Sequence, residues 1–349
     1  MLVFYIALFA LTFINCKFSG KDFFKEESLS REVTDSVKGV FIWLVFLSHF
    51  SSYATYSSTL DLAGQRISSL LGQLVVACFL FYSGYGVCEA IGKKGSDYIR
   101  AMPINRIAKT LLHFVLAVLL FLLVKIGLGE TFSIKTVLLS FIGWESLGNS
   151  NWYIFVILAL YIITWFSFMC VGKNASRAVA LVTILTGALI VFLYFTRWSW
   201  WYDTALCYVF GMWFSLYKNK FLAFITKNNL AWSMCALGAL IVFGILYLFP
   251  GGTIIGLTVK LMVAPIFCLV IAILLTKICI SNRVLVFSGQ YLFEIYILQR
   301  IPMILLKEWG LADINIYVYF VLCVIITILF SVAFRFVTNK IDQLVFKCW

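Results

Sequence analysis

The chain is poor in charge and in proline. Of its 349 residues only 12% are charged and four are proline, whereas a soluble domain carries about 25% charged residues. No Pro-, Ser- or Gly-rich linker divides the sequence, so we expect one domain. The hydrophobic content of 63% exceeds what the interior of a chain this size would bury. A water-soluble globular fold is therefore excluded, and lipid must solvate much of the protein.

The sequence also lacks paired cysteines. Its ten cysteines are scattered, mostly through apolar segments, and none forms a C-x-x-C pair. This pattern favours small apolar filler residues over a disulfide framework or a zinc site. We therefore expect no metal.

Long apolar runs dominate what is present. Runs of about 15–24 residues suit membrane-spanning helices, and the chain has them at 1–16, 39–55, 68–91, 107–128, 152–171, 179–196, 203–217, 230–249, 254–276, 284–306 and 314–336. The first run has no basic leader or cleavage site, so we interpret it as a retained span. The sequence predicts an all-α, polytopic integral membrane helical bundle of about 11 transmembrane helices, with one N-terminal helix added to a core of ten.

The net charge of +12 resides in short loops between these runs. The segments 17–38, 92–106, 172–178, 218–229, 277–283 and the tail after 334 hold 19 of the 27 Lys and Arg residues. These segments share one side if every run crosses once, and the positive-inside rule makes that side cytoplasmic. We therefore expect the N-terminus outside, the C-terminus in the cytoplasm, and no nucleic-acid partner. The expected parts are 1–34 (extra helix and loop), 35–336 (membrane domain) and 337–349 (short cytoplasmic tail).

The second span carries two ionisable residues at separate depths. Lys38 and His49 are 11 residues apart, so they share one helix face about 16 Å apart along the axis. With Lys38 at the cytoplasmic end, His49 lies past mid-membrane, where it would be suited to act as a general base. In the alternative interpretation, Lys38 reaches to the headgroups and His49 only bridges helices.

Several motifs share their order and spacing with one family. They are Asp-x-x-Lys-Gly at Asp35–Gly39 with His49 eleven residues after the lysine, Phe79–Gly86 (FLFYSGYG), Tyr98–Ile107 (YIRAMPINRI), Asn149–Ile154 (NSNWYI) and Ser288–Gln299 (SGQYLFEIYILQ). Together they resemble the membrane-bound acyltransferase-3 family, from about Asp35 to Phe336. The sequence departs from the family pattern in three places. Lys38 stands where Arg is usual, Gln299 stands where His is common, and Pro103 stands in the basic loop, where the family often has two arginines three residues apart.

The resemblance implies an integral membrane O-acyltransferase of a bacterial inner membrane. Its donor would be acyl-CoA, often acetyl-CoA. Its acceptor would be a hydroxyl on an extracytoplasmic glycan or glycolipid, such as a surface polysaccharide. His49 would be the catalytic base of a direct transfer, with an acyl-enzyme on His49 itself as the alternative.

The remaining candidate site residues fall on the two sides of the membrane. Lys38, Arg106 and Arg100 would hold the phosphates of CoA, although positive-inside anchoring explains the two arginines as well. Asn151 and Trp152 at the outer mouth are acceptor-side candidates.

Two further candidates lie within the span at 284–306. Glu294 would orient His49 or neutralise a lysine, or would pair with Arg300 or Lys260 in a structural role. Tyr296 would donate a hydrogen bond to a sugar or carbonyl, although buried tyrosines are usually structural.

Two other classes of membrane protein share the span count and the basic inner face. A glycolipid or polysaccharide flippase or transporter often shows paired repeats and interrupted helices, and neither is evident in the sequence. A polysaccharide polymerase would carry a long outer loop. Neither class would depend on acyl-CoA, so an assay with labelled acetyl-CoA distinguishes them from an acyltransferase.

Overall fold

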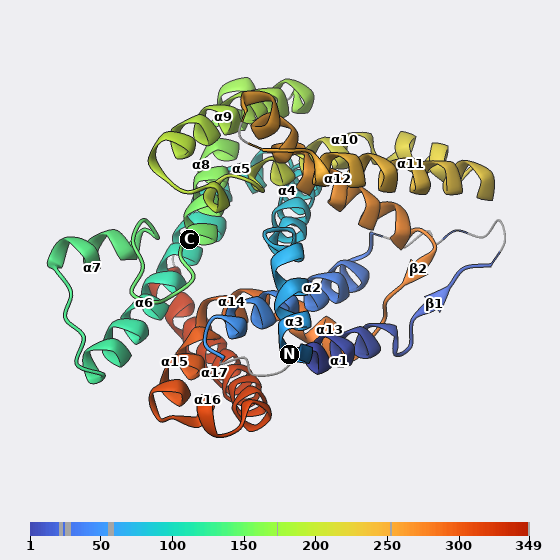
Figure 1. Ribbon diagram of the computed structural model, residues 1–349. Helices are drawn as coiled ribbons and strands as arrows, with labels where there is room; N and C mark the ends of the chain where they lie inside the picture. Colours follow the sequence, from blue (N-terminus) through green and yellow to red (C-terminus); the bar gives the residue numbers. More distant parts are fainter. Residues whose placement is uncertain (21–23, 25–28, 55–58, 173, 252, 348–349) are drawn as a thin grey trace.

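The computed structural model describes residues 1–349 except 21–23, 25–28, 55–58, 173, 252 and 348–349 (Figure 1). The described chain is almost entirely helical. Its helices are α1 (Leu2–Phe13), α2 (Arg31–Ser51), α3 (Thr59–Leu71), α4 (Leu74–Lys94), α5 (Ser96–Met102), the π-helix η1 (Pro103–Ala108), α6 (Lys109–Gly127), α7 (Ile134–Phe141), α8 (Trp152–Val171), α9 (Ala175–Thr196), the 3₁₀ turn η2 (Ser199–Trp201), α10 (Ala205–Ile225), α11 (Asn229–Leu248), α12 (Ile254–Leu275), α13 (Arg283–Gln290), α14 (Leu292–Leu298), α15 (Arg300–Glu308), α16 (Leu311–Ile314) and α17 (Ile316–Val345).

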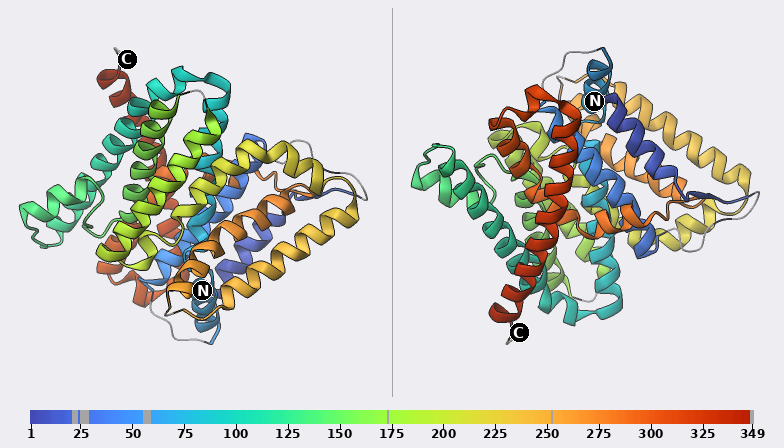
Figure 2. Two further views of the ribbon diagram at one scale, coloured as in Figure 1. Left: turned by 90° about the horizontal axis from the view of Figure 1, so that it is seen from above. Right: turned by 90° about the horizontal axis from the view of Figure 1, so that it is seen from below.

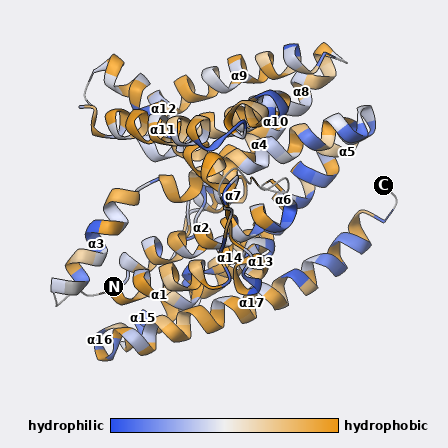
Figure 3. Ribbon diagram, turned by 90° about the vertical axis from the view of Figure 1, so that its right-hand side faces the viewer, coloured by the Kyte–Doolittle hydropathy of each residue, from blue (hydrophilic) through white to orange (hydrophobic). Residues whose placement is uncertain are grey.

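Eight helical segments of the described chain are long and apolar enough to cross a membrane. They are Arg31–Ser51, Asp61–Lys94, Ser96–Gly127, Trp152–Val171, Ala175–Thr196, Asn229–Leu248, Ile254–Leu275 and Ile316–Val345. Figure 3 shows hydrophobic residues along most helices, with hydrophilic ones gathered around α5 and the C-terminal end of α17. A polytopic helical membrane protein is thus confirmed, and the count of eleven spans stays a prediction.

Three of the predicted spans are not found among these eight helical segments. The run at 1–16 forms only the 12-residue α1, and the run at 203–217 forms α10, which is not among the eight. The run at 284–306 is divided into α13, α14 and α15 by breaks at Tyr291 and Gln299. The residues expected as a short tail from 337 instead continue α17 as far as Val345.

Contacts between distant loops agree with the predicted alternation of sides. The strands β1 (Lys17–Phe18) and β2 (Ile278–Cys279) pair antiparallel, which joins two basic loops expected on the cytoplasmic side. Glu145 and Arg197, from two loops expected outside, form an ion pair of 3.2 Å. The two termini lie at opposite sides of the bundle (Figure 2).

Glycine brings the backbones of α2 and α13 into contact. A Cβ added at Gly39 would lie 2.0 Å from the carbonyl oxygen of Leu285, and one at Gly289 would lie 1.8 Å from that of Asp35. Small residues permit such close approach, which favours helix association in lipid, where no hydrophobic force between helices is available. This crossing fixes α2, and with it Lys38 and His49, against the segment that leads into α14.

A second glycine crossing joins α4 and α10. A Cβ at Gly84 would lie 1.9 Å from the carbonyl oxygen of Tyr208, and one at Gly211 would lie 2.0 Å from that of Phe81. Gly84, in the Ser-Gly-Tyr motif, thus permits close packing of α4 against α10.

Candidate functional site

The first turns of α2 hold Lys38 in an ion pair. Ser30 caps the helix by accepting a hydrogen bond from the backbone N–H of Val33. Asp35 is buried, and its Oδ1 lies 2.6 Å from Lys38 Nζ, while Arg31 lies 3.6 Å from its other oxygen. The Asp-x-x-Lys-Gly motif is thus an i,i+3 ion pair followed by the glycine of the α2–α13 crossing. The partner of Lys38 was not anticipated from the sequence.

His49 lies near the other end of the same helix, beside α14. Its Nδ1 is buried and has no hydrogen-bond partner among the described residues. The His49 and Tyr296 rings are 6.3 Å apart, centroid to centroid. A buried polar atom without a partner is rare in a native structure and calls for a ligand, a water or a catalytic role. His49 therefore has the free ring nitrogen that a general base requires.

Other unpartnered polar atoms gather around Tyr296. The Tyr296 hydroxyl is buried without a hydrogen bond, and the Ser150 hydroxyl lies beside it without meeting hydrogen-bond geometry. Gln299 is fully buried, donates to the carbonyl of Tyr296 at 3.2 Å, and leaves its own Oε1 without a partner. The Nε of Arg300 is buried and unpartnered as well. The arrangement offers donors and an acceptor to a bound molecule.

The segment before α8 closes this cluster from another side. Tyr153 packs on Tyr296 with ring centroids 5.1 Å apart, and Trp152 packs edge-on against Tyr153 at 6.1 Å. The side-chain amide of Asn151 donates a hydrogen bond to the carbonyl of Gly143 at 2.9 Å. The side chain that was predicted to bind the acceptor therefore stabilises the loop instead. Ser150, which was not a candidate from the sequence, lies beside the Tyr296 hydroxyl.

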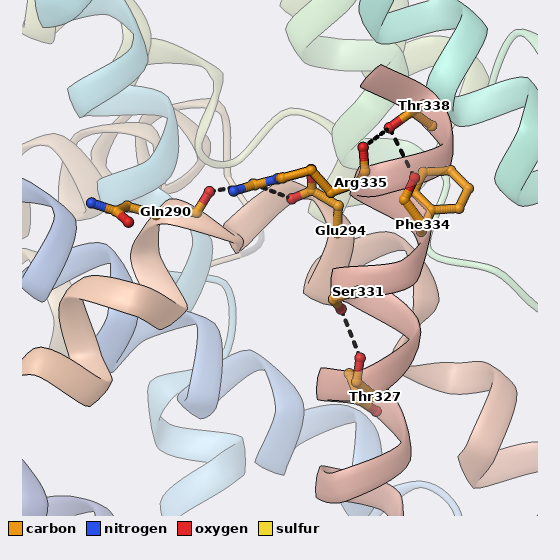
Figure 4. Close-up of polar contacts among 7 residues, drawn as sticks. All are labelled: Gln290, Glu294, Thr327, Ser331, Phe334, Arg335 and Thr338. Carbon is orange, nitrogen blue, oxygen red and sulfur yellow. Dashed lines mark hydrogen bonds and ion pairs between the residues drawn. The ribbon is translucent and has the colours of Figure 1, made fainter. Parts of the chain in front are cut away.

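Glu294 does not contact His49. It accepts hydrogen bonds from Arg335 Nε at 2.7 Å and Nη2 at 2.6 Å, so the ion pair is bidentate (Figure 4). Arg335 also donates to the carbonyl of Gln290 and stacks on the Tyr291 ring at 3.7 Å. The expected partners of Glu294, which were His49, Arg300 and Lys260, are therefore wrong. Glu294 and Arg335 bind α14 to α17.

Arg106 enters the bundle from the π-helical turn η1. Its Nε donates to the Tyr98 hydroxyl at 3.0 Å, and Tyr161 and Tyr208 lie close to its guanidinium. The described residues include no acidic partner for it. π-Helical turns are common at functional sites, and an unpaired guanidinium is suited to phosphate. Arg100, by contrast, is exposed.

Arg300 is a site residue whose importance the sequence argument missed. It begins α15, lies within electrostatic range of both His49 and Tyr296, and has no ion pair among the described residues. It is the sole Lys or Arg in the apolar run 284–306. That signal marks a functional residue by default in a membrane span.

The part of the chain that contains these residues also matches a known protein family. A family model described as an Acyltransferase domain matches residues 34–336. The chain belongs to the acyltransferase-3 family. No curated protein and no solved structure matches it. The match covers His49, Arg106, the α14–α15 break and Arg335, and it does not include α1.

Proposed function

We propose that this acyltransferase moves an acetyl group from cytoplasmic acetyl-CoA to a hydroxyl of an extracytoplasmic glycan or glycolipid in a bacterial inner membrane. The observation that carries the proposal is the buried Nδ1 of His49, which has no partner among the described residues, in a ring 6.3 Å from that of Tyr296, whose hydroxyl is also unpartnered. A general base and a hydrogen-bond donor, both unoccupied, are what transfer of an acyl group to a hydroxyl requires.

In the proposed reaction, His49 takes the proton of the acceptor hydroxyl. The acceptor oxygen forms a bond to the thioester carbonyl carbon, and the Tyr296 hydroxyl donates a hydrogen bond to the oxygen on which negative charge develops. The carbon–sulfur bond then breaks, and the departing thiolate of CoA takes the proton back from His49. The products are the acetyl ester and free CoA.

Arg106 is the better supported candidate for the phosphates of CoA. Its guanidinium has a tyrosine partner and no acidic one among the described residues, whereas the charge of Lys38 is already compensated by Asp35. An unpaired guanidinium can bind phosphate in a bidentate manner. Arg100 lies at the surface of the same region and would contribute charge only at the entrance.

The test is transfer of labelled acetyl from acetyl-CoA by membranes that contain the full chain. His49→Ala should lower transfer by about 100-fold or more, the range expected for loss of a general base. His113→Gln is a matched control, because the second histidine pairs with Asp342 at 2.9 Å, away from the cluster. Equal transfer by His49→Ala and wild type would refute the proposal. Movement of a glycolipid without any need for acetyl-CoA would favour a flippase.

A further inference from the structure

Four of the cations on the predicted outer side differ in their partners, while Arg66, Lys135 and Lys260 on that side also form no ion pair among the described residues. Lys125 pairs with Glu130 at 2.6 Å, and Arg197 pairs with Glu145 at 3.2 Å. Arg300 and Lys307, both on α15, have no acidic partner among the described residues. Both lie over the ring of Tyr53, with Arg300 Cζ 5.5 Å and Lys307 Nζ 5.8 Å from its centroid.

These groups form a row that leads away from His49. Arg300 follows Tyr296 by four residues and Lys307 follows Arg300 by seven. Gln299, at the break between α14 and α15, keeps helical dihedral angles (φ −55°, ψ −29°). The three side chains therefore share one face, separated by about 6 Å and 10 Å along the axis. Tyr53 follows His49 by four residues and lies opposite the two cations. The row starts at the buried cluster, and Lys307 at its far end is exposed.

An aromatic ring compensates a cation only in part. A cation–π contact at an exposed site contributes about 0.5–1 kcal/mol, whereas hydrogen bonds to a charged group are stronger and, for arginine, bidentate. Arg300 has its Nε buried and unpartnered, so its guanidinium is held ready for an anion. Lys125 and Arg197 each have a carboxylate partner within the protein, whereas Arg300 has only the Tyr53 ring.

We propose that the acceptor is anionic: a glycan or glycolipid whose phosphate or carboxylate binds Arg300 and Lys307 while a nearby hydroxyl lies at His49. This inference rests on the proposed function and names the class of its acceptor. A neutral glycan would leave both cations uncompensated. The row Tyr296–Arg300–Lys307 places the negative charge of the acceptor about one to three helical turns from the hydroxyl that reacts.

Binding to the full chain in phosphatidylcholine nanodiscs, without acyl-CoA, tests the inference. The probes are a fluorescent trisaccharide with one uronic acid, the same trisaccharide with the neutral sugar, and a polyprenyl-diphosphate-linked disaccharide. At least one anionic probe should bind tenfold or more tightly than the neutral one. Arg300→Gln and Lys307→Gln should each weaken that binding about tenfold, the loss of one charge-assisted hydrogen bond. Lys135→Gln on α7, which projects from the bundle (Figure 1), should leave it unchanged.

Each outcome has one meaning. Tight binding of the diphosphate alone identifies a lipid-linked acceptor, and tight binding of the uronic acid alone identifies an acidic polymer. Equal binding of the neutral probe, or full binding by Lys307→Gln, overturns the inference. Lys307 is exposed, so its variant folds even where Arg300→Gln does not. Because acyl-CoA is absent, anion-selective binding by a protein that transfers no acetyl would reject the proposed function and leave the anion site standing.

Discussion

Gly289→Ala tests whether the α2–α13 crossing positions His49 against Tyr296, the two residues proposed to act in catalysis. The added Cβ would lie 1.8 Å from the carbonyl oxygen of Asp35, and ordinary contact begins at 3.4 Å, so the helices must separate by about 1.6 Å. The obstacle is backbone, which cannot rotate away as a side chain can. Overpacking of this kind typically costs about 1–3 kcal/mol of stability.

The displacement reaches the site because each helix carries one of its members. α2 carries His49, and α13 leads directly into α14 with Tyr296, whose ring is 6.3 Å from that of His49. A misplacement of about 1 Å between reacting groups can lower the rate about 100-fold. We therefore expect Gly289→Ala to lower kcat for acetyl transfer by about 100-fold while enough protein remains folded to be assayed.

Two other alanine substitutions make the experiment specific. A Cβ at Gly86 meets no atom within 4 Å, so Gly86→Ala should keep the wild-type rate and thermal midpoint. A Cβ at Gly84 would lie 1.9 Å from the carbonyl oxygen of Tyr208 at the other crossing, so Gly84→Ala should lower the thermal midpoint. Per folded molecule, it should lower kcat less than Gly289→Ala does. A Gly289→Ala variant with the wild-type kcat and the wild-type thermal midpoint would refute this prediction.

Three further predictions concern single side chains. Arg106→Lys should raise KM for acetyl-CoA about tenfold, since one bidentate contact is lost, and an unchanged KM with lower kcat would contradict a phosphate contact. Glu294→Met or Arg335→Met alone should destabilise the protein by about 3 kcal/mol, because each leaves one charge of the pair without its partner. The double variant should recover most of that lost stability. Additive losses of stability in a thermal double-mutant cycle would argue against the pair. Burial raises the pKa of Asp203, in the loop before α10, to about 6, against the opposing effects of Ser199 and Lys260. The folded state then holds the proton more tightly than the unfolded state, so stability should fall as pH rises from about 4 to 6. Asp203→Asn should remove this pH dependence of stability and stabilise the protein at pH 8 by at most about 3 kcal/mol. Identical unfolding profiles of the variant and wild type at pH 4 and at pH 8 would refute this.

The sequence alone predicted that lipid solvates much of the chain, that the fold is all-helical, and which family the chain belongs to. Whether a segment belongs in lipid depends on its own composition, so apolar runs predicted the membrane helices without any knowledge of their neighbours. The motifs of α2 and of α14 are likewise local, since Lys38 and His49 share one helix face through spacing alone.

Tertiary structure decided which groups meet. Glu294 pairs with Arg335, 41 residues away, and no local pattern distinguishes that partner from Arg300 or Lys260. The same holds for His49, whose free Nδ1 and proximity to Tyr296 depend on how α2 crosses α13. The breaks that turn one apolar run into α13, α14 and α15 are invisible to hydropathy, because apolar content says where a segment is solvated and not whether its backbone is continuous. Charge pairing and helix breaks are properties of the packed bundle, and they determine what this site can bind.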